Sequence, residues 1–486
     1  MKNKWFVNYM LVMLLMFSSI VSCNMQEYEI PITSSSEKAI QLFKEGRNLV
    51  ENIKINEGRQ KLNEAIAVDP DFAMAYLYKA NLSGDYNTRM ANLAKAVRLI
   101  DKVSTGEKYL ILTYKASYDG NQGLMWENFN NLLELYPNDK RVHYLGGYLS
   151  YNRLIYDKAL NYFQKAYELD MEFPPAVNML GYTYMKLEKY DEAEQYLKKY
   201  IEKLPKNASP YDSYADLLLL REKFDESIRY YKKAVKIDES YYYPIRKIGN
   251  VYLIKKEFDE ARKYFKQYYE VATQLNSKFL ALYNLANSYL YENNKDRALE
   301  VYEEYKDLAI ENNLAYNEIL SIVYQGYIHA CCGDIEKGLD YYKIAIDKTA
   351  TTDLTEEQKF NLKMNLLTWT SQAYLDQNDI EKSKQELEKC SKMAEKLDNK
   401  NISDWVDMFY AYSDIKQEKY EEAINKLNKV NIRNPLVNFY YALAYELKGE
   451  KEQARKYYEK VLNEKQSGID LALFYTKAEK KVSELK

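Results

Sequence analysis

The chain has 486 residues, of which 47% are hydrophobic and 29% charged, so it is long enough for more than one hydrophobic core. Its formal net charge is −3, and both signs alternate along the chain without a basic block, which argues against nucleic acid as a partner. Lys, Glu, Leu, Ala and Tyr dominate, whereas there are only 15 Gly and 9 Pro. This composition favours helices over sheets and argues against a disordered chain.

Residues 1–22 have the order of a secretory signal peptide. Lys2 and Lys4 precede an apolar run from Trp5 to Phe17, and small residues follow. The run is too short and too poorly flanked for a permanent membrane span. The sequence that ends in Cys23, Ile-Val-Ser-Cys, resembles a bacterial lipobox. That resemblance implies cleavage before Cys23 and lipidation of its thiol; the alternative is an ordinary signal peptide with a chance cysteine.

Residues 23–38 are expected to be the lipidated cysteine and a flexible tether. The stretch after Cys23 is polar, contains one proline and has no helical period. Fourteen extended residues span about 45 Å. Glu27 and Glu29 resemble the acidic export signals of some Bacteroidota lipoproteins. The expected location is therefore the bacterial cell envelope, with a lipid anchor in the outer membrane, on its periplasmic or its surface face.

A repeat of 34 residues follows. Small residues recur at this spacing, and twelve positions later a second small residue recurs, followed by a bulky residue four positions on. The first series is Gly147, Gly181, Ala215 and Gly249; the second is Ala159, Ala193, Ser227 and Ala261; the bulky series is Phe163, Leu197, Tyr231 and Phe265.

This period and pattern resemble the tetratricopeptide repeat (TPR), a helix–turn–helix unit. Leu180, Gly181, Tyr184, Ala193 and Pro205 lie at the signature positions of that family. Small residues allow the two helices of a unit to approach closely, and larger ones there would overpack the contact. The resemblance implies an all-α fold, an α-solenoid superhelix of about twelve such repeats with a C-terminal capping helix.

The repeats are predicted to fall into two arrays. Residues 39–278 hold mostly 34-residue units, and residues 279–465 hold longer units of about 40 to 45 residues. Residues 466–486 carry Leu471, Phe474, Ala478 and Val482 at three- and four-residue steps. This spacing predicts a capping helix with its apolar face toward the last repeat.

No motif for catalysis, for a metal or for another cofactor stands out. His143 and His329 are far apart and lack metal-ligand spacing. The neighbours Cys331 and Cys332 point about 100° apart on a helix, which is poor disulfide geometry. Together with Cys390 they are interpreted as small apolar fillers. We therefore expect a protein that is not an enzyme and binds no metal or cofactor.

The concave surface is the remaining candidate site. In the TPR family the first helix of each unit lines a groove, and this resemblance implies which side chains face it. The predicted partner-binding residues are Tyr144, Tyr148, Tyr151, Asn178, Tyr182, Asp212, Asp216, Arg246, Asn250, Tyr283 and Asn287. Tyrosine is frequent at binding hot spots, although each of these rings could equally pack between helices.

The function expected from this reading is a scaffold for protein–protein interaction, tethered to the cell envelope through Cys23. Its groove would hold an extended peptide or a helix of an envelope protein. The alternative is a scaffold for polysaccharide binding or export, because tyrosine rings also suit sugar rings, so a glycan is a second possible partner. A third hypothesis is a sensor whose curvature changes when a ligand binds.

Overall fold

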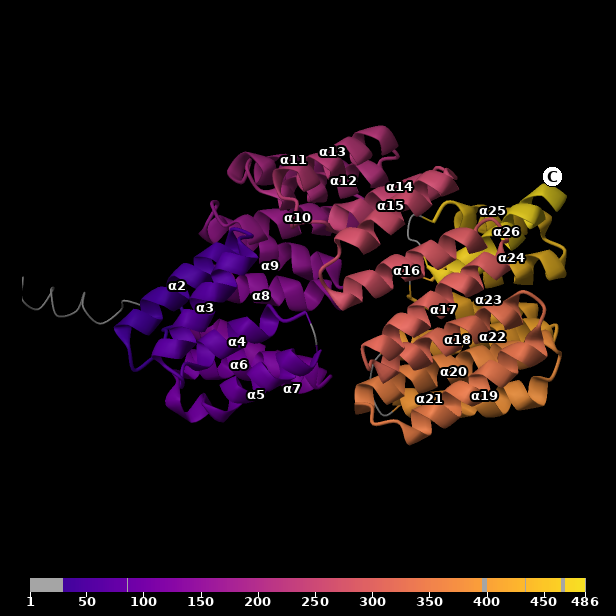
Figure 1. Ribbon diagram of the computed structural model, residues 1–486, viewed down its shortest axis with the longest axis horizontal. Coiled ribbons are helices and arrows are strands. Elements are labelled where there is room, and N and C mark those ends of the chain that lie inside the picture. Colours follow the sequence, from indigo (N-terminus) through magenta and orange to yellow (C-terminus); the bar gives the residue numbers. More distant parts are fainter. Residues whose placement is uncertain (1–28, 85, 396–399, 433, 465–467, 486) are drawn as a thin grey trace, which may run out of the picture. The chain divides into compact units, whose positions relative to one another are not determined.

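The computed structural model describes residues 29–84, 86–395, 400–432, 434–464 and 468–485. Within these residues the regular secondary structure consists of α-helices and one short 3₁₀ helix, η1 (Ile100–Lys102), without strands. The chain divides into two compact units, which we call unit 1, ending at Glu222, and unit 2, beginning at Lys223 (Figure 1). The predicted signal peptide and Cys23 lie outside the described residues.

Unit 1 contains eleven of the described helices. They are α2 (Glu37–Glu51), α3 (Ile55–Val68), α4 (Ala73–Asn81), α5 (Tyr86–Arg98), α6 (Thr105–Tyr118), α7 (Gln122–Leu135), α8 (Lys140–Tyr151), α9 (Tyr156–Leu169), α10 (Pro174–Lys186), α11 (Tyr190–Lys203) and α12 (Ala208–Leu220).

Unit 2 contains the other helices. They are α13 (Phe224–Ile237), α14 (Tyr243–Ile254), α15 (Phe258–Val271), α16 (Leu275–Leu290), α17 (Lys295–Glu311), α18 (Ala315–Cys331), α19 (Ile335–Thr351), α20 (Glu356–Asp376), α21 (Ile380–Glu395), α22 (Lys400–Lys416), α23 (Tyr420–Leu427), α24 (Pro435–Lys448), α25 (Lys451–Leu462) and α26 (Ile469–Glu484).

Taken two at a time, α2 to α25 make twelve consecutive helix pairs, and α26 follows them. The all-α fold class and the number of repeats predicted from the sequence are confirmed. From α16 to α22 the helices have 16 to 21 residues, whereas those from α8 to α15 have 12 to 14. None of the described helices is both long and apolar enough to cross a bilayer.

The turns inside the pairs keep the same period as the sequence. Leu154, Glu188, Glu222 and Lys256, spaced 34 residues apart, all have a φ close to +60°. At Glu188 the chain ends α10 in a left-handed residue, and the next amide, that of Lys189, donates to the carbonyl oxygen of Tyr184 over 2.9 Å. This arrangement satisfies carbonyl groups at the end of the helix while the chain reverses direction.

Small residues mark the contacts between paired helices. A Cβ placed on Gly181 of α10 would lie 2.6 Å from a methyl carbon of Leu197 on α11. Ala193, Leu197 and Tyr200 of α11 are themselves fully buried. The glycine therefore leaves the space that the bulky residue of the second helix fills, as the repeat pattern predicted.

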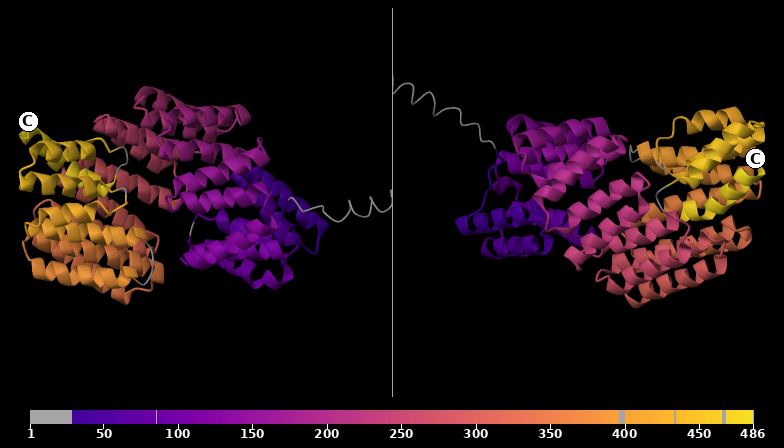
Figure 2. Two further views of the ribbon diagram at one scale, coloured as in Figure 1. Left: turned by 180° about the vertical axis from the view of Figure 1, so that it is seen from behind. Right: turned by 90° about the horizontal axis from the view of Figure 1, so that it is seen from above.

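In unit 2 the last helix covers the end of the array and also contacts a helix far earlier in the chain. Helix α26 packs on α25 and α24 and also reaches α16, and Figure 2 shows the yellow C-terminal helices side by side. The inner helices α18, α20, α22 and α24 contact one another in sequence order. Because α26 joins α24 to α16, the chain itself occupies the inner side of these pairs.

Candidate functional site

The inner side of unit 1 has a partly open cavity of about 340 Å³. Side chains from the first helices of successive pairs, α2, α4, α6, α8 and α10, line it. The lining includes Arg47, Glu51, Met74, Tyr78, Asn81, Leu110, Tyr114, Arg141, Tyr144, Leu145, Phe173 and Asn178. The array curls far enough for the amide of Asn207, before α12, to donate to the carbonyl oxygen of Asn52 at the end of α2.

An extended segment lies along this inner side. Residues 29–36, which we call the strap, precede α2, whose N-cap is Ser36. Three of its backbone N–H groups donate to carboxylates over 2.9 Å each: Ile30 to Asp139, Thr33 to Glu107 and Ser35 to Asp69. The part of the expected flexible tether that the structure describes is therefore bound to unit 1.

The three carboxylates lie near the starts of the first helices of three successive pairs. Asp139 is the N-cap of α8, Glu107 is the third residue of α6 and part of its capping box, and Asp69 is the C-cap of α3, in the turn before α4. Their exposed fractions are only 2%, 0% and 5%. A buried carboxylate needs hydrogen-bond donors, and here the strap supplies part of them. We call this set of three the carboxylate ladder.

Two arginines meet the first residue of the strap. The side chain of Glu29 lies 3.0 Å from Arg141 and 3.6 Å from Arg47. Arg141 also forms a two-pronged ion pair with Glu51 on α2, at 2.6 and 2.9 Å. Burial raises the pKa of Glu29, but the charges of Arg141 and Arg47 outweigh burial and leave its pKa below the ordinary value.

Two isoleucines of the strap form part of the cavity wall. Ile30 and Ile32 both line the cavity, because alternate side chains of an extended chain point to the same side. Ile32 packs on the core around α3 and α4, and Ile30 packs on the core around α7 and α8. The strap thus forms one wall of the cavity.

Three tyrosines give the cavity a polar component. Burial raises the pKa of Tyr78, Tyr114 and Tyr144 above that of free tyrosine. Among the described residues their hydroxyl groups have no hydrogen-bond partner. The Oδ1 atom of Asn178 is likewise buried without a partner among these residues. A ligand in the cavity would find donors and acceptors on its walls.

The predicted groove residues of unit 1 lie in different surroundings. Tyr144 and Asn178 line the cavity. Tyr148 is 43% exposed and Tyr151 is half-buried. The hydroxyl group of Tyr182 donates to Asp216 over 2.7 Å.

Asp212 on α12, another of the predicted residues, is buried. The structure therefore places two of the seven residues predicted in unit 1, Tyr144 and Asn178, in the lining of the cavity. Sequence reasoning missed Arg47, Arg141 and the carboxylate ladder. The available signal was an acidic residue before or in the first turn of each of three inner helices.

The predicted groove residues of unit 2 lie on α14 and α16. Arg246 and Asn250 are half-buried on α14. Tyr283 accepts a hydrogen bond from the backbone N–H of Ile469, at the start of α26, over 2.9 Å. Asn287 is buried and accepts one from Tyr302 over 3.1 Å. Tyr283 and Asn287 are therefore engaged within unit 2 itself.

Helix α26 enters the inner side of unit 2 with a buried acid. Asp470 accepts hydrogen bonds from the hydroxyl of Tyr327 over 2.8 Å and from the amide of Asn434 over 3.0 Å. Burial raises the pKa of Asp470, and these two hydrogen bonds only partly oppose that effect. The ammonium group of Lys477 donates to the carbonyl oxygen of Cys331 over 2.9 Å.

The histidines and cysteines have structural surroundings. The Nε2 atom of His143 lies 2.8 Å from the carbonyl oxygen of Pro137, and the Nδ1 atom of His329 lies 3.4 Å from Asp334. Burial raises the pKa of the Cys331 thiol and raises that of Cys390 to about 12, so neither is an activated nucleophile. In the described part of the chain no group of His, Cys, Asp and Glu has the geometry of a metal site.

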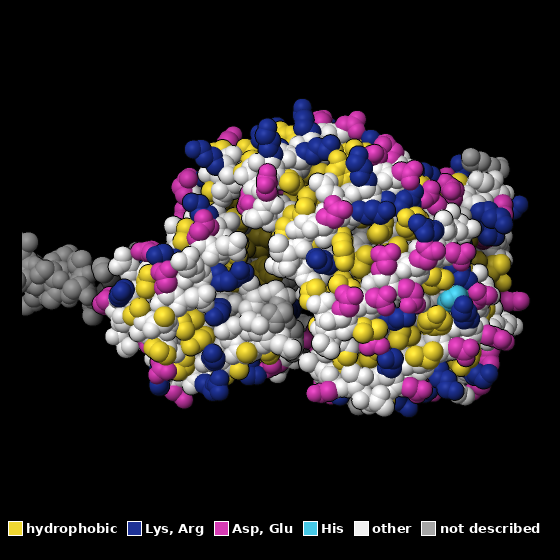
Figure 3. Space-filling view, viewed as in Figure 1, with side chains coloured by type: hydrophobic (Ala, Val, Ile, Leu, Met, Phe, Trp, Pro, Cys, Tyr) yellow, Lys and Arg dark blue, Asp and Glu magenta, His cyan; other side chains and the backbone are white. Residues whose placement is uncertain are grey.

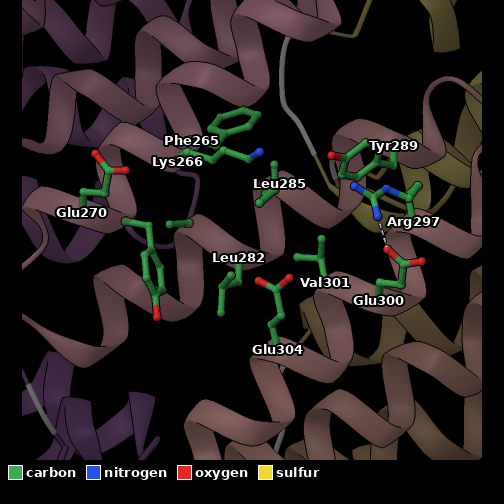
Figure 4. A pocket seen from close by; sticks show the side chains of 12 residues that line it. Phe265, Lys266, Glu270, Leu282, Leu285, Tyr289, Arg297, Glu300, Val301 and Glu304 are labelled. Carbon is green, nitrogen blue, oxygen red and sulfur yellow. Dashed lines mark hydrogen bonds and ion pairs between the residues drawn. The ribbon is translucent and has the colours of Figure 1, made fainter.

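Unit 2 also has a surface pocket of about 370 Å³ between α15, α16 and α17. Figure 4 shows the apolar residues Leu282, Leu285 and Val301 among the charged Glu270, Glu300, Glu304, Lys266 and Arg297. Arg297 is already paired with Glu300. This mixture of charges is typical of the whole face drawn in Figure 3, where side chains of both signs are interspersed.

Several segments of the chain match models of a known protein family. Models of a family described as tetratricopeptide repeat match residues 156–217, 208–241, 246–313, 366–397 and 411–468, which together make up about half of the chain. Among curated proteins no sequence matches it.

Solved structures are similar to the chain at low sequence identity. The yeast protein Tom70 is 18% identical with a TM-score of 0.44, over 85% of this chain and 96% of its own. A tetratricopeptide repeat protein from Parabacteroides merdae is 13% identical with a TM-score of 0.35, over 52% and 93%. MamA from Desulfovibrio magneticus RS-1 is 19% identical with a TM-score of 0.30, over 34% and 93%.

Proposed function

The chain belongs to the tetratricopeptide repeat family, and from this premise we propose that it is a non-enzymatic scaffold that holds a segment of a partner protein. The proposed binding surface is the inner side of unit 1, where the cavity, the arginine pair and the carboxylate ladder lie together. Repeat arrays of this kind use their inner surfaces for binding. The proposed partner is a protein of the bacterial cell envelope.

The observation that carries this proposal is the strap. A peptide-binding groove needs groups that hold the backbone of an extended segment and pockets that take alternate side chains. On the inner side of unit 1, the carboxylate ladder accepts backbone N–H groups of the strap, and Ile30 and Ile32 form part of the cavity wall. An extended segment of another protein could use the same groups.

The proposal includes a lipid anchor on Cys23. Its support is the leader of residues 1–22 with its lipobox-like end. If the strap is bound, six residue steps from Cys23 to Glu29 remain, and these span at most about 20 Å. Unit 1 would then stay close to the outer membrane, with its inner side within reach of other envelope proteins.

The anchor has a direct test. A Cys23→Ser variant should move from the membrane fraction to the soluble fraction of the envelope, while the wild-type protein labels with a radioactive fatty acid. A wild-type protein that takes up no label would remove the anchor from the proposal.

A glycan is the second candidate ligand. The hydroxyl groups of Tyr78, Tyr114 and Tyr144 at the cavity favour it, since sugars bind aromatic faces and hydrogen-bond to nearby polar groups. A sugar in the cavity would not need to displace the strap, which would stay bound to the carboxylate ladder. A glycan array separates the two: the protein hypothesis predicts no signal, whereas a reproducible signal for one polymer would favour the polysaccharide scaffold.

In-cell photo-crosslinking tests the proposed function. A photoreactive amino acid replaces Tyr144 at the cavity in one variant and Lys165, an exposed residue of α9, in a matched control. We expect the Tyr144 variant to crosslink to one defined segment of an envelope protein, identified by mass spectrometry, and the control not to. Equal crosslinking from both positions, or none from Tyr144, would contradict binding at this surface.

A further inference from the structure

We propose that the strap occupies the place of the partner, and that the partner enters by strand exchange with it. The segment recognised would be extended. It would carry a carboxylate at the place of Glu29 and large apolar side chains at the places of Ile30 and Ile32. This inference rests on the proposed function and specifies the chemistry of its ligand. It has three supports, namely the carboxylate ladder, the arginine pair and the unfilled cavity.

The carboxylate ladder favours an occupant of the inner side of unit 1. Asp69, Glu107 and Asp139 are buried, and each receives a backbone N–H of the strap. If the strap left without replacement, these carboxylates would lose donors in a place where water has poor access, which is unfavourable. An incoming extended segment replaces the lost donors with its own N–H groups, so departure of the strap and arrival of the partner are coupled.

The arginine pair sets the charge of the ligand. Arg47 and Arg141 converge on Glu29, and Glu51 neutralises the other side of Arg141. The side chain of Glu29 keeps about half of its surface exposed, at 51%, whereas those of Arg47 and Arg141 are 12% and 17% exposed. The arginines are thus fixed parts of unit 1, and the acid is the exchangeable partner. A carboxylate is the side chain that fits two fixed guanidinium groups.

The cavity explains how a partner could displace a segment that is covalently attached. An attached strap competes at a high effective concentration, so the partner must bind the site better than the strap does. The space of about 340 Å³ beneath Ile30 and Ile32 remains unfilled. A segment with larger apolar side chains at these two positions would fill it and gain contacts that the strap lacks.

The backbone hydrogen bonds of the strap show which positions of a bound segment need a free N–H group. Pro31 has no N–H group, and the ladder has no acceptor for that position; its acceptors serve Ile30, Thr33 and Ser35. The partner need not contain proline, but it needs free N–H groups at the places of these three residues. Recognition therefore combines backbone N–H groups with selectivity at the acid, at the two apolar positions, and at Thr33 and Ser34, whose hydroxyl groups also donate to the carboxylate ladder.

Peptide binding in trans tests the proposal. The probe is a fluorescent peptide of residues 26–37, added to the full-length protein and to a variant with Ile30→Asp and Ile32→Asp, which weakens the strap. We expect the variant to bind the probe at least ten-fold more tightly than the wild type does. A probe with both isoleucines replaced by phenylalanine should bind more tightly still, because it fills the cavity.

The control changes the peptide rather than the protein, so folding is unaffected. A probe with the counterpart of Glu29 replaced by glutamine should lose at least ten-fold in affinity for the strap-weakened variant. Equal affinity of the two probes, or no binding of any probe, would overturn the proposal. A wild-type protein that forms dimers in sedimentation, with the strap of one copy in the other, would also overturn it.

The two proposals can fail separately. If no peptide binds but Tyr144 still crosslinks to an envelope protein, strand exchange is wrong and the scaffold function stands. If the peptides bind as expected but no crosslink forms in cells, the site binds only the strap of its own chain, and the proposed partner is wrong.

Discussion

At the scale of single residues, glycines decide how closely the paired helices approach. At Gly181 an added Cβ meets the end of the flexible Leu197 side chain, which can shift. At Gly338 of α19 it would lie 2.8 Å from the carbonyl oxygen of Gly326 and 2.9 Å from the backbone nitrogen of Ala330, both on α18. Backbone atoms of a packed helix cannot move alone, so Gly338 is the more demanding position.

We predict that Gly338→Ala lowers the free energy of unfolding by about 1–3 kcal/mol, because the helices α18 and α19 must separate slightly. Urea unfolding followed by circular dichroism measures this change. The matched control is Gly123→Ala in α7, where a Cβ would meet no atom closer than 3.8 Å. The control should be neutral or stabilising by up to about 1 kcal/mol; an equal loss in both variants would contradict the packing argument.

At the scale of elements, the two ends of the described chain both turn inward. The strap lies along the inner side of unit 1, and α26 lies on the inner side of unit 2, where Asp470 binds Tyr327 and Asn434. The sequence predicted a tether and a capping helix at these places. Helix α26 was recognisable from its apolar spacing, but its contact with α16 was not, because nothing in a local pattern specifies a partner helix so far away in the chain.

The buried acid of α26 gives a pH dependence of defined sign. Because burial raises the pKa of Asp470 in the folded protein, its contribution to stability is present below the unfolded pKa and is lost as the pH rises through the folded pKa. We therefore predict that Asp470→Asn gains stability relative to the wild type as the pH rises from about 4 to about 8.

Urea unfolding at a series of pH values measures this difference. The control is Asp307→Asn, since Asp307 is an exposed acid on α17. Its difference from the wild type is the reference against which the change at Asp470 is read. A difference between Asp470→Asn and the wild type that does not change with pH would contradict the raised pKa of Asp470.

At the scale of the whole molecule, the repeat could be predicted and the site only in part. The 34-residue period fixed which residues are buried, such as Ala193 and Leu197, because each helix pair repeats the same local packing. It also placed Tyr144 and Asn178 on the inner side, where both line the cavity. These are properties of position within one repeat.

The strap, by contrast, has no period, and its contacts depend on how many repeats curl together. Ile30 binds Asp139, 109 residues away, and Arg141 binds Glu51, 90 residues away. Such pairs form only once four helix pairs have stacked, so no local pattern identifies them. Residues 23–38 are polar and have no helical period, which is expected both for a free tether and for a segment that binds through its backbone. The sequence therefore does not distinguish the two.

Hydrogen–deuterium exchange of the strap in the full-length protein tests the central claim most directly. The account predicts an uneven pattern: the amides of Ile30, Thr33 and Ser35, which donate to the carboxylate ladder, exchange slowly, and those of Ile32 and Ser34 exchange faster. If all five amides exchange as fast as in a free peptide of the same sequence, the inner side of unit 1 does not hold an extended segment, and the account is wrong.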